Sequence, residues 1–131
     1  MKGAFGLRVV PDGTLDNAVD LLTVPGGGHI GRTPQGVRAQ IAEGKLTRKV
    51  AELNRQDAIM GGVCTGAMIL SAAGVLDGRA AITHHASVAD RPETSAKVVQ
   101  TRVVDDGDIV TFGGLTRRSI WRYRLSTGFG R

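Results

Sequence analysis

The stretch from Ala58 to His84, AIMGGVCTGAMILSAAGVLDGRAAITH, decides the fold because its pattern changes at a single cysteine. Residues 58–63 form a short apolar run, which predicts a buried strand. Residues 65–73 are mostly small or apolar and are followed by Gly74, which predicts a buried helix that ends at that glycine. Cys64 therefore lies at a turn from strand to helix, between Gly62 and Gly66.

Further strands and helices alternate around this turn. The run 20–24 stops at Pro25 and the glycines 26–28, which predicts a buried strand followed by a glycine-rich turn. Residues 34–54 show near-helical apolar spacing, and Gly44 is expected to divide this helix. Strands are predicted at 80–83, 98–104 and 109–112, the last two joined by a turn at 105–108 as a hairpin. This alternation predicts an α/β domain with a largely parallel sheet.

The bulk properties predict one soluble cytoplasmic domain. The chain has 131 residues and a single cysteine, which cannot form an internal disulfide. No apolar run approaches the ~20 residues of a membrane span, so no membrane partner is expected. The first residues lack the apolar core and cleavage site of a signal peptide. No histidine–cysteine cluster has the spacing of metal ligands, and neither a metal nor another cofactor is predicted.

The positive charge of the chain is confined to its end. The net charge is +5, yet residues 1–115 contain 12 Lys and Arg against 12 Asp and Glu. The excess comes from arginines 117, 118, 122, 124 and 131, in a segment that contains no acidic residue. A basic tail with interspersed aromatic residues is typical of nucleic-acid binding.

Cys64 is the main candidate for chemistry. A sharp strand-to-helix turn exposes its side chain above the sheet, and the start of the next helix favours a thiolate. Thr65 supplies a hydroxyl and an N–H beside the sulfur, and the glycines 26–28 could bring a second N–H, which together make an oxyanion hole. The alternative is that Cys64 is a small buried apolar residue. The pattern alone leaves both open.

Other candidate residues are less specific. His84 and His85 follow a predicted strand, where they could hold a thiolate's proton or simply form a surface pair. His29 is interpreted as a loop residue. The glycines 26–28 lack the spacing of known phosphate-binding loops.

Three strings carry a family resemblance. Residues 63–79 with 82–84, the string DLLTVPGGG and the string RVVDDGDIVTFGG resemble the ThiJ/PfpI superfamily, which has the class I glutamine amidotransferase-like fold. The similarity covers residues 7–115 and is greatest to isonitrile hydratases and to the amidotransferase-like domains of AraC-type regulators. It implies a flavodoxin-like layered sheet with a nucleophile elbow and a late hairpin.

The resemblance also implies roles for particular residues. Cys64 matches the family nucleophile, Thr65 the threonine that follows it in isonitrile hydratases, and Gly27 and Gly28 the oxyanion turn. His84 matches a histidine found near the cysteine in several branches. A small-molecule substrate or ligand is implied, without a cofactor. Homodimers are common in this superfamily.

The chain departs from the family pattern at its start. Members begin with a strand–helix–strand unit whose first strand ends in an acid that hydrogen-bonds the cysteine. Here Asp12 and Asp16 lie in a polar turn segment. The resemblance therefore implies an incomplete domain over residues 1–115 that lacks the catalytic acid and a central strand. A partner chain could supply that strand.

A second departure lies in residues 116–131, which we interpret as an aberrant basic tail. Members carry a helix reading like GIDLALxLVERF after the hairpin. When residues 119–129 are written in GC-rich codons and read from the third base, they give DLALSLVDRF. A frameshift near residue 116 explains the arginines without a nucleic-acid partner.

Three functions follow from these observations. The first is an enzyme similar to isonitrile hydratase, in which Cys64 forms a covalent adduct during addition of water. The second is a non-catalytic ligand-sensing domain left from an AraC-type regulator. The third is a degraded fragment that exposes a sheet edge and has no independent function.

The frameshift hypothesis predicts the codons of the gene. We expect the nucleotide sequence encoding residues 119–129 to read DLALSLVDRF when shifted to the third base. Sequencing the gene measures this directly. Codons that do not permit the second reading would contradict the hypothesis.

Overall fold

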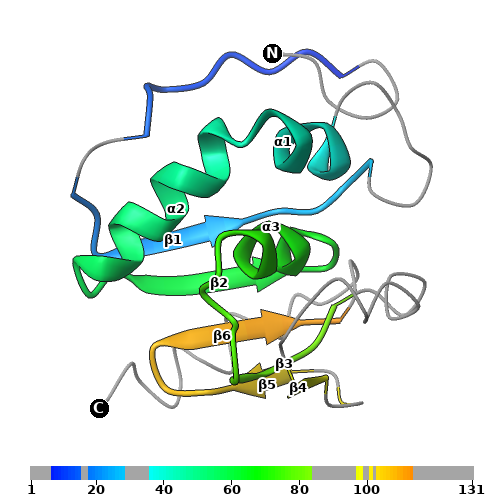
Figure 1. Ribbon diagram of the computed structural model, residues 1–131. Helices are drawn as coiled ribbons and strands as arrows, with labels where there is room; N and C mark the ends of the chain where they lie inside the picture. The colour runs from blue at the N-terminus through cyan, green and yellow to red at the C-terminus, as the bar shows by residue number, and fades with distance from the viewer. Residues whose placement is uncertain are drawn as a thin grey trace.

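Figure 1 shows the computed structural model, which describes residues 7–15, 18–28, 36–83, 97–98, 101 and 103–113. The elements follow in the order β1 (Leu21–Val24), α1 (Val37–Glu43), α2 (Lys45–Arg55), β2 (Ile59–Val63), α3 (Gly66–Ala72), β3 (Ala80–Ala81), β4 (Lys97–Val98), β5 (Val103–Asp105) and β6 (Ile109–Phe112). The predicted alternation of strands and helices is confirmed. The proposed tail, residues 116–131, lies outside the described residues.

The main sheet has four strands in the order β1-β2-β6-β5. β1, β2 and β6 are parallel, and β5 joins β6 as the antiparallel arm of the late hairpin. β3 and β4 form a separate parallel pair. The prediction of a mostly parallel α/β sheet is therefore confirmed, and β2 lies in it with a partner on each side.

The two faces of the sheet have different surroundings. Met60 of β2 pairs with Ile109 of β6, and both side chains belong to the core that contains Val50 and Leu53 of α2. Figure 1 shows α1, α2 and α3 grouped together beside β1 and β2. Side chains alternate between the two faces of a strand, and Val110 and Phe112 of β6 belong to a second, smaller cluster on the other face. The helices therefore cover the Met60 face.

Gly44 divides the helical region, as predicted. Its φ of 79° ends α1, and its N–H donates to the Gln40 carbonyl at 3.0 Å. The same residue precedes α2, where the Thr47 hydroxyl donates to the Gly44 carbonyl at 2.8 Å. Such a left-handed conformation suits glycine, because it carries no Cβ.

The single strand predicted for residues 98–104 is wrong. Val98 pairs with Ala81 in the small sheet, whereas Val103 pairs with Phe112 in the main sheet. Between them, the Thr101 hydroxyl donates to the Val103 carbonyl at 2.6 Å and accepts from the Val103 N–H at 3.2 Å. A threonine side chain that takes backbone partners in this way competes with strand pairing.

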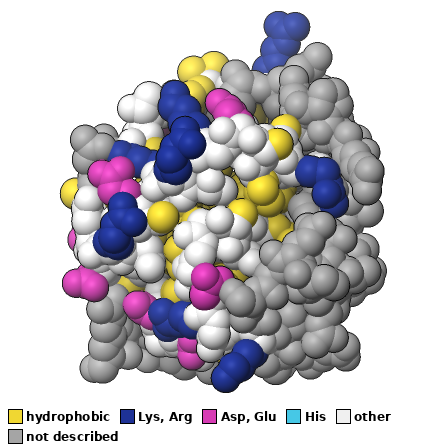
Figure 2. Space-filling view, in the orientation of Figure 1, with side chains coloured by type: hydrophobic (Ala, Val, Ile, Leu, Met, Phe, Trp, Pro, Cys, Tyr) yellow, Lys and Arg dark blue, Asp and Glu magenta, His cyan; other side chains and the backbone are white. Residues whose placement is uncertain are grey.

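The face of the molecule drawn in Figure 2 is mixed in charge over the described residues. Figure 2 shows Lys and Arg side chains scattered among Asp and Glu on this face, rather than gathered into one basic patch. Within the part of the chain that the structure describes, none of the helices is both long and apolar enough to span a bilayer.

The burial of two leucines predicts that changing each to alanine lowers the free energy of unfolding by very different amounts. Leu53 is 0% exposed in the helix-side core, whereas Leu21 on the edge strand β1 is 41% exposed. We expect Leu53→Ala to lower the free energy of unfolding by about 3 kcal/mol, because it removes buried methyl groups and leaves a cavity. Leu21→Ala should cost less than about 1 kcal/mol. Urea denaturation of both variants measures this, and equal losses would contradict the assignment of the core.

Candidate functional site

Cys64 lies at a strained turn between β2 and α3. Its φ is 54°, one of only two positive values among the described non-glycine residues. A left-handed conformation costs a residue with a Cβ on the order of 1–2 kcal/mol, so the surroundings must hold it. The Cys64 N–H donates to the Phe112 carbonyl at 2.8 Å, and the Cys64 carbonyl accepts from the Thr83 hydroxyl at 3.0 Å. The backbone N–H and the carbonyl of Cys64 are therefore both held by hydrogen bonds.

The turn packs tightly against the end of β1. A Cβ on Gly66 would lie 2.8 Å from the Pro25 carbonyl oxygen and would also clash with the Val24 carbonyl. A Cβ on Gly26 would lie 2.6 Å from Thr65 Oγ1. Side chains at these positions would separate the two parallel strands where they end. The glycines therefore bring the glycine-rich turn and the cysteine turn together.

Thr65 connects these two turns. The Gly27 N–H donates to Thr65 Oγ1 at 2.8 Å, and the Gly27 carbonyl accepts from the Val37 N–H at 2.7 Å. An oxyanion could take the Gly27 N–H only after the Thr65 hydroxyl moved away. Gly28 follows with a φ of 71°. The structure thus places Cys64, Thr65 and the Gly27–Gly28 turn side by side.

The cysteine itself is largely shielded. Cys64 is 5% exposed and Thr65 is 3% exposed, so the prediction that the turn exposes the Cys64 side chain is wrong. The predicted histidine His84, as well as His29 and His85, lies outside the described residues. Of the acids considered upstream, Asp16 also lies outside them, and Asp12 is exposed. Asp20 lies at the opposite end of β1 from the cysteine turn.

The segment from Arg79 to Thr83 was not predicted to contribute to the site. The Ile82 N–H donates to Thr111 Oγ1 at 2.9 Å. The next residue, Thr83, donates its hydroxyl to the Cys64 carbonyl. The buried polar side chains among the described residues are Thr65, Thr83 and Thr111. Thr65 belongs to the cysteine turn, Thr83 bonds the Cys64 carbonyl, and Thr111 bonds the residue before Thr83. A polar side chain inside an apolar run, as at Thr83 and Thr111, is the signal that could have revealed them.

Arg79 fastens the start of this segment to the β5–β6 turn. Its Nε donates to Asp106 Oδ2 at 2.7 Å and an Nη donates to Asp108 Oδ1 at 2.6 Å, with a further bond to the Asp106 carbonyl. Partial burial acts to lower the pKa of the Arg79 guanidinium, but these bonds and the carboxylate charges raise it above its ordinary value. Arg79 is therefore a permanent cation at this turn.

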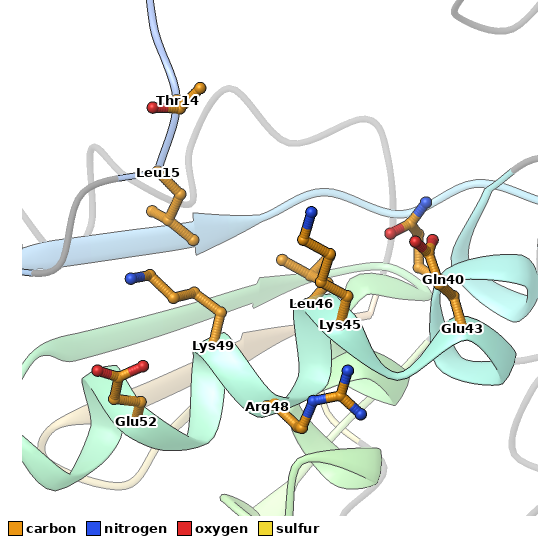
Figure 3. A pocket seen from close by; sticks show the side chains of 9 residues that line it. All are labelled: Thr14, Leu15, Gln40, Glu43, Lys45, Leu46, Arg48, Lys49 and Glu52. Atoms are coloured by element: carbon orange, nitrogen blue, oxygen red, sulfur yellow. The ribbon is translucent and has the colours of Figure 1, made fainter.

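A groove of about 530 Å³ lies elsewhere, between residues 14–15 and α2. Figure 3 shows Lys45, Lys49 and Glu52 projecting from α2 along it. The lining consists of Thr14, Leu15, Gln40, Glu43, Lys45, Leu46, Arg48, Lys49 and Glu52. None of these is a predicted site residue. Within the described part of the chain, no group of three acidic, histidine or cysteine side chains could hold a metal ion.

Comparison with known proteins identifies the family. The model of the DJ-1/PfpI family matches residues 1–121, and the chain belongs to this family. The resemblance to the ThiJ/PfpI superfamily is thereby confirmed.

Three relatives illustrate the range of the family. The chain is 34% identical over 124 residues to an isonitrile hydratase of Pseudomonas putida, covering 88% of this chain and 49% of that protein. It is 30% identical over 131 residues to the HTH-type transcriptional regulator GbdR of Pseudomonas aeruginosa, covering 96% and 34% respectively. A ThiJ/PfpI family protein from Pseudomonas syringae is similar in structure, with a TM-score of 0.73, 28% identity and coverage of 93% and 48%. The chain thus spans half or less of the length of these relatives.

The close approach at Gly66 generates a prediction. Gly66→Ala should lower the free energy of unfolding by about 2 kcal/mol, because the new methyl group meets the backbone of β1 rather than a movable side chain. Gly13→Ala is the matched control, since a Cβ there has nothing within 4 Å. Urea denaturation compares the two variants. Equal stability of both would show that the turn does not pack against β1 as described.

Proposed function

We propose that Cys64 is the nucleophile of a reaction like that of isonitrile hydratase. The observation that carries the proposal is the left-handed turn at Cys64, with its backbone held on both sides and the Gly27–Gly28 turn beside it. This geometry supports covalent catalysis, because a strained turn presents one side chain in a fixed direction. The similarity to a curated isonitrile hydratase supports the substrate class.

The proposed reaction adds water to an isonitrile carbon in two steps. The Cys64 sulfur bonds to the terminal carbon of R–N≡C, and the thiol proton ends on that carbon, giving the thioimidate R–N=CH–S–Cys64. Water oxygen then bonds to the same carbon and its protons pass to nitrogen and sulfur. The C–S bond breaks, releasing the formamide R–NH–CHO and the free thiol. No oxidant, metal or cofactor is consumed.

Thr65 and the glycine turn have a defined part in this proposal. Negative charge that develops on the adduct requires donors placed before the reaction. Rotation of the Thr65 hydroxyl away from Gly27 would free one such N–H. Gly28 and the Thr65 N–H are further proposed donors, and His84 is proposed to transfer protons. We assign no carboxylate to this task among the described residues.

A second candidate function is ligand sensing without turnover. The specific observation in its favour is that Cys64 is buried and the Gly27 N–H is already taken by Thr65 Oγ1. A domain of this kind would bind a small molecule, as a relative of the regulator GbdR could do. In both proposals the ligand is a small molecule met in the cytoplasm, and a homodimer is compatible with either.

Formation of an N-formamide tests the first proposal. Purified protein incubated with a small aliphatic isonitrile should release the formamide, measured by proton NMR. Cys64→Ala should lower the rate by roughly a thousandfold or more, since the adduct cannot form. Mass spectrometry should detect the thioimidate on Cys64 in the unaltered protein.

The control is Thr23→Val, a change on the exposed side of β1 that should leave the rate unchanged. Formamide release that survives in Cys64→Ala would overturn the nucleophile assignment. A ligand-dependent rise in Tm without formamide in the unaltered protein would support the sensing function instead.

A further inference from the structure

We propose that Thr83 is a positioning residue, whose hydroxyl fixes the backbone of Cys64 and thereby the direction of its side chain. This inference rests on the proposed function of Cys64 and adds a residue to that site. Neither the family match nor the sequence pattern assigns Thr83 a role. The evidence for this role is a set of hydrogen bonds between segments that are distant in the sequence.

The bond from Thr83 holds the strained residue at its carbonyl. Thr83 Oγ1 donates to the Cys64 carbonyl at 3.0 Å across a sequence separation of 19. Buried threonines often bond a carbonyl within their own strand or helix, which would make the residue a local structural feature. The bond at Thr83 instead joins the end of the β3 segment to the turn after β2. Thr83 is 7% exposed, so water is a poor substitute for its hydroxyl.

Thr83 is itself held in place by β6. The adjacent Ile82 N–H donates to Thr111 Oγ1 at 2.9 Å, and Thr111 is fully buried. The next residue on β6, Phe112, accepts the Cys64 N–H at 2.8 Å. Hydrogen bonds and peptide bonds thus close a ring through Cys64, Phe112, Thr111, Ile82 and Thr83. One strand thereby fixes both ends of the cysteine residue.

Arg79 anchors the other end of the same segment. Its bonds to Asp106 and Asp108 tie the segment to the turn from which β6 begins. The Arg79 carbonyl also accepts the Lys97 N–H of β4 at 2.9 Å. Residues 79–83 therefore lie beside β6 with attachments at both ends, so Thr83 cannot move without disturbing β6.

The consequence for the thiol is geometric. The φ angle of a residue sets the direction of its Cα–Cβ bond relative to the strand before it. The Cys64 carbonyl also accepts from the Ala67 N–H, at the longer distance of 3.4 Å. When the shorter bond from Thr83 is lost, less holds Cys64 in the left-handed region, which is unfavourable for a residue with a Cβ. The direction of the Cα–Cβ bond, and with it the position of the sulfur, would then change. The Thr83 hydroxyl therefore maintains the arrangement that the proposed reaction requires.

Hydrogen exchange of three variants tests the proposal without requiring turnover. In Thr83→Val, the amides of residues 63–67 should exchange about tenfold faster than in the unaltered protein, while those of residues 47–53 in α2 stay unchanged. Thr83→Ser keeps a hydroxyl and should exchange as the unaltered protein does. Thr23→Val is the exposed threonine control and should change neither region.

Three results would overturn the proposal. One is unchanged exchange of residues 63–67 in Thr83→Val. Another is an equal increase in α2, which indicates general destabilisation. The third is amide exchange of residues 63–67 that is as fast in Thr83→Ser as in Thr83→Val. Should Thr83→Val fail to fold, NMR of the unaltered protein decides the question: a slowly exchanging Thr83 hydroxyl proton close to Cys64 is expected, and its absence contradicts the bond.

Kinetics connect Thr83 to the proposed reaction. With an isonitrile substrate, Thr83→Val should lower kcat by about tenfold and leave KM within about twofold, because the substrate still binds but the sulfur is misdirected. Thr83→Ser should restore kcat. If the unaltered protein releases no formamide, the proposed function fails, whereas the exchange measurements still decide the role of Thr83.

Discussion

The hydrogen bond from the Cys64 N–H to the Phe112 carbonyl is the contact on which the site depends. It continues the pairing of β2 with β6 one residue beyond the end of β2. On its other side β2 pairs with β1, so the strand cannot shift in register without breaking both ladders. The turn after β2 is thus forced to begin at a fixed point. Strain at Cys64 persists because two strands oppose its relaxation.

Hydroxyl groups supply most of the side-chain bonds around this turn. Thr65 receives the Gly27 N–H, Thr83 donates to the Cys64 carbonyl, and Thr111 receives the Ile82 N–H. In a buried environment each of these bonds is stronger than it would be in water, and each group is costly if left unpaired. A small polar side chain that is neutral satisfies backbone groups without the cost of burying a charge. This explains why the interior polar residues described here are all threonines.

The two proposed functions, catalysis and ligand sensing, use the same geometry and differ in one movement. A hydratase must free donors for the adduct, whereas a sensing domain can keep the Gly27 N–H on Thr65 and respond to a ligand nearby. The chain is similar to proteins of both kinds, an isonitrile hydratase and a transcriptional regulator. The groove along α2 is lined by none of the predicted site residues, so it is a separate feature from the cysteine turn.

The sequence alone determined the order of elements and the place of the cysteine, because these depend on local patterns. An apolar run, a cysteine between glycines and a small-residue helix identify the turn without knowledge of the sheet, and Gly44 marks the break between α1 and α2. Residues 98–104 escaped the same reasoning, because the Thr101 hydroxyl bonds the backbone of Val103 and competes with strand pairing there. Only the tertiary structure decided which groups surround Cys64. Thr83 and Thr111 lie 19 and 47 residues beyond it in the sequence. The pairing of β2 with β6 brings Thr111 near the cysteine turn, and the bond from the Ile82 N–H to Thr111 brings Thr83 there.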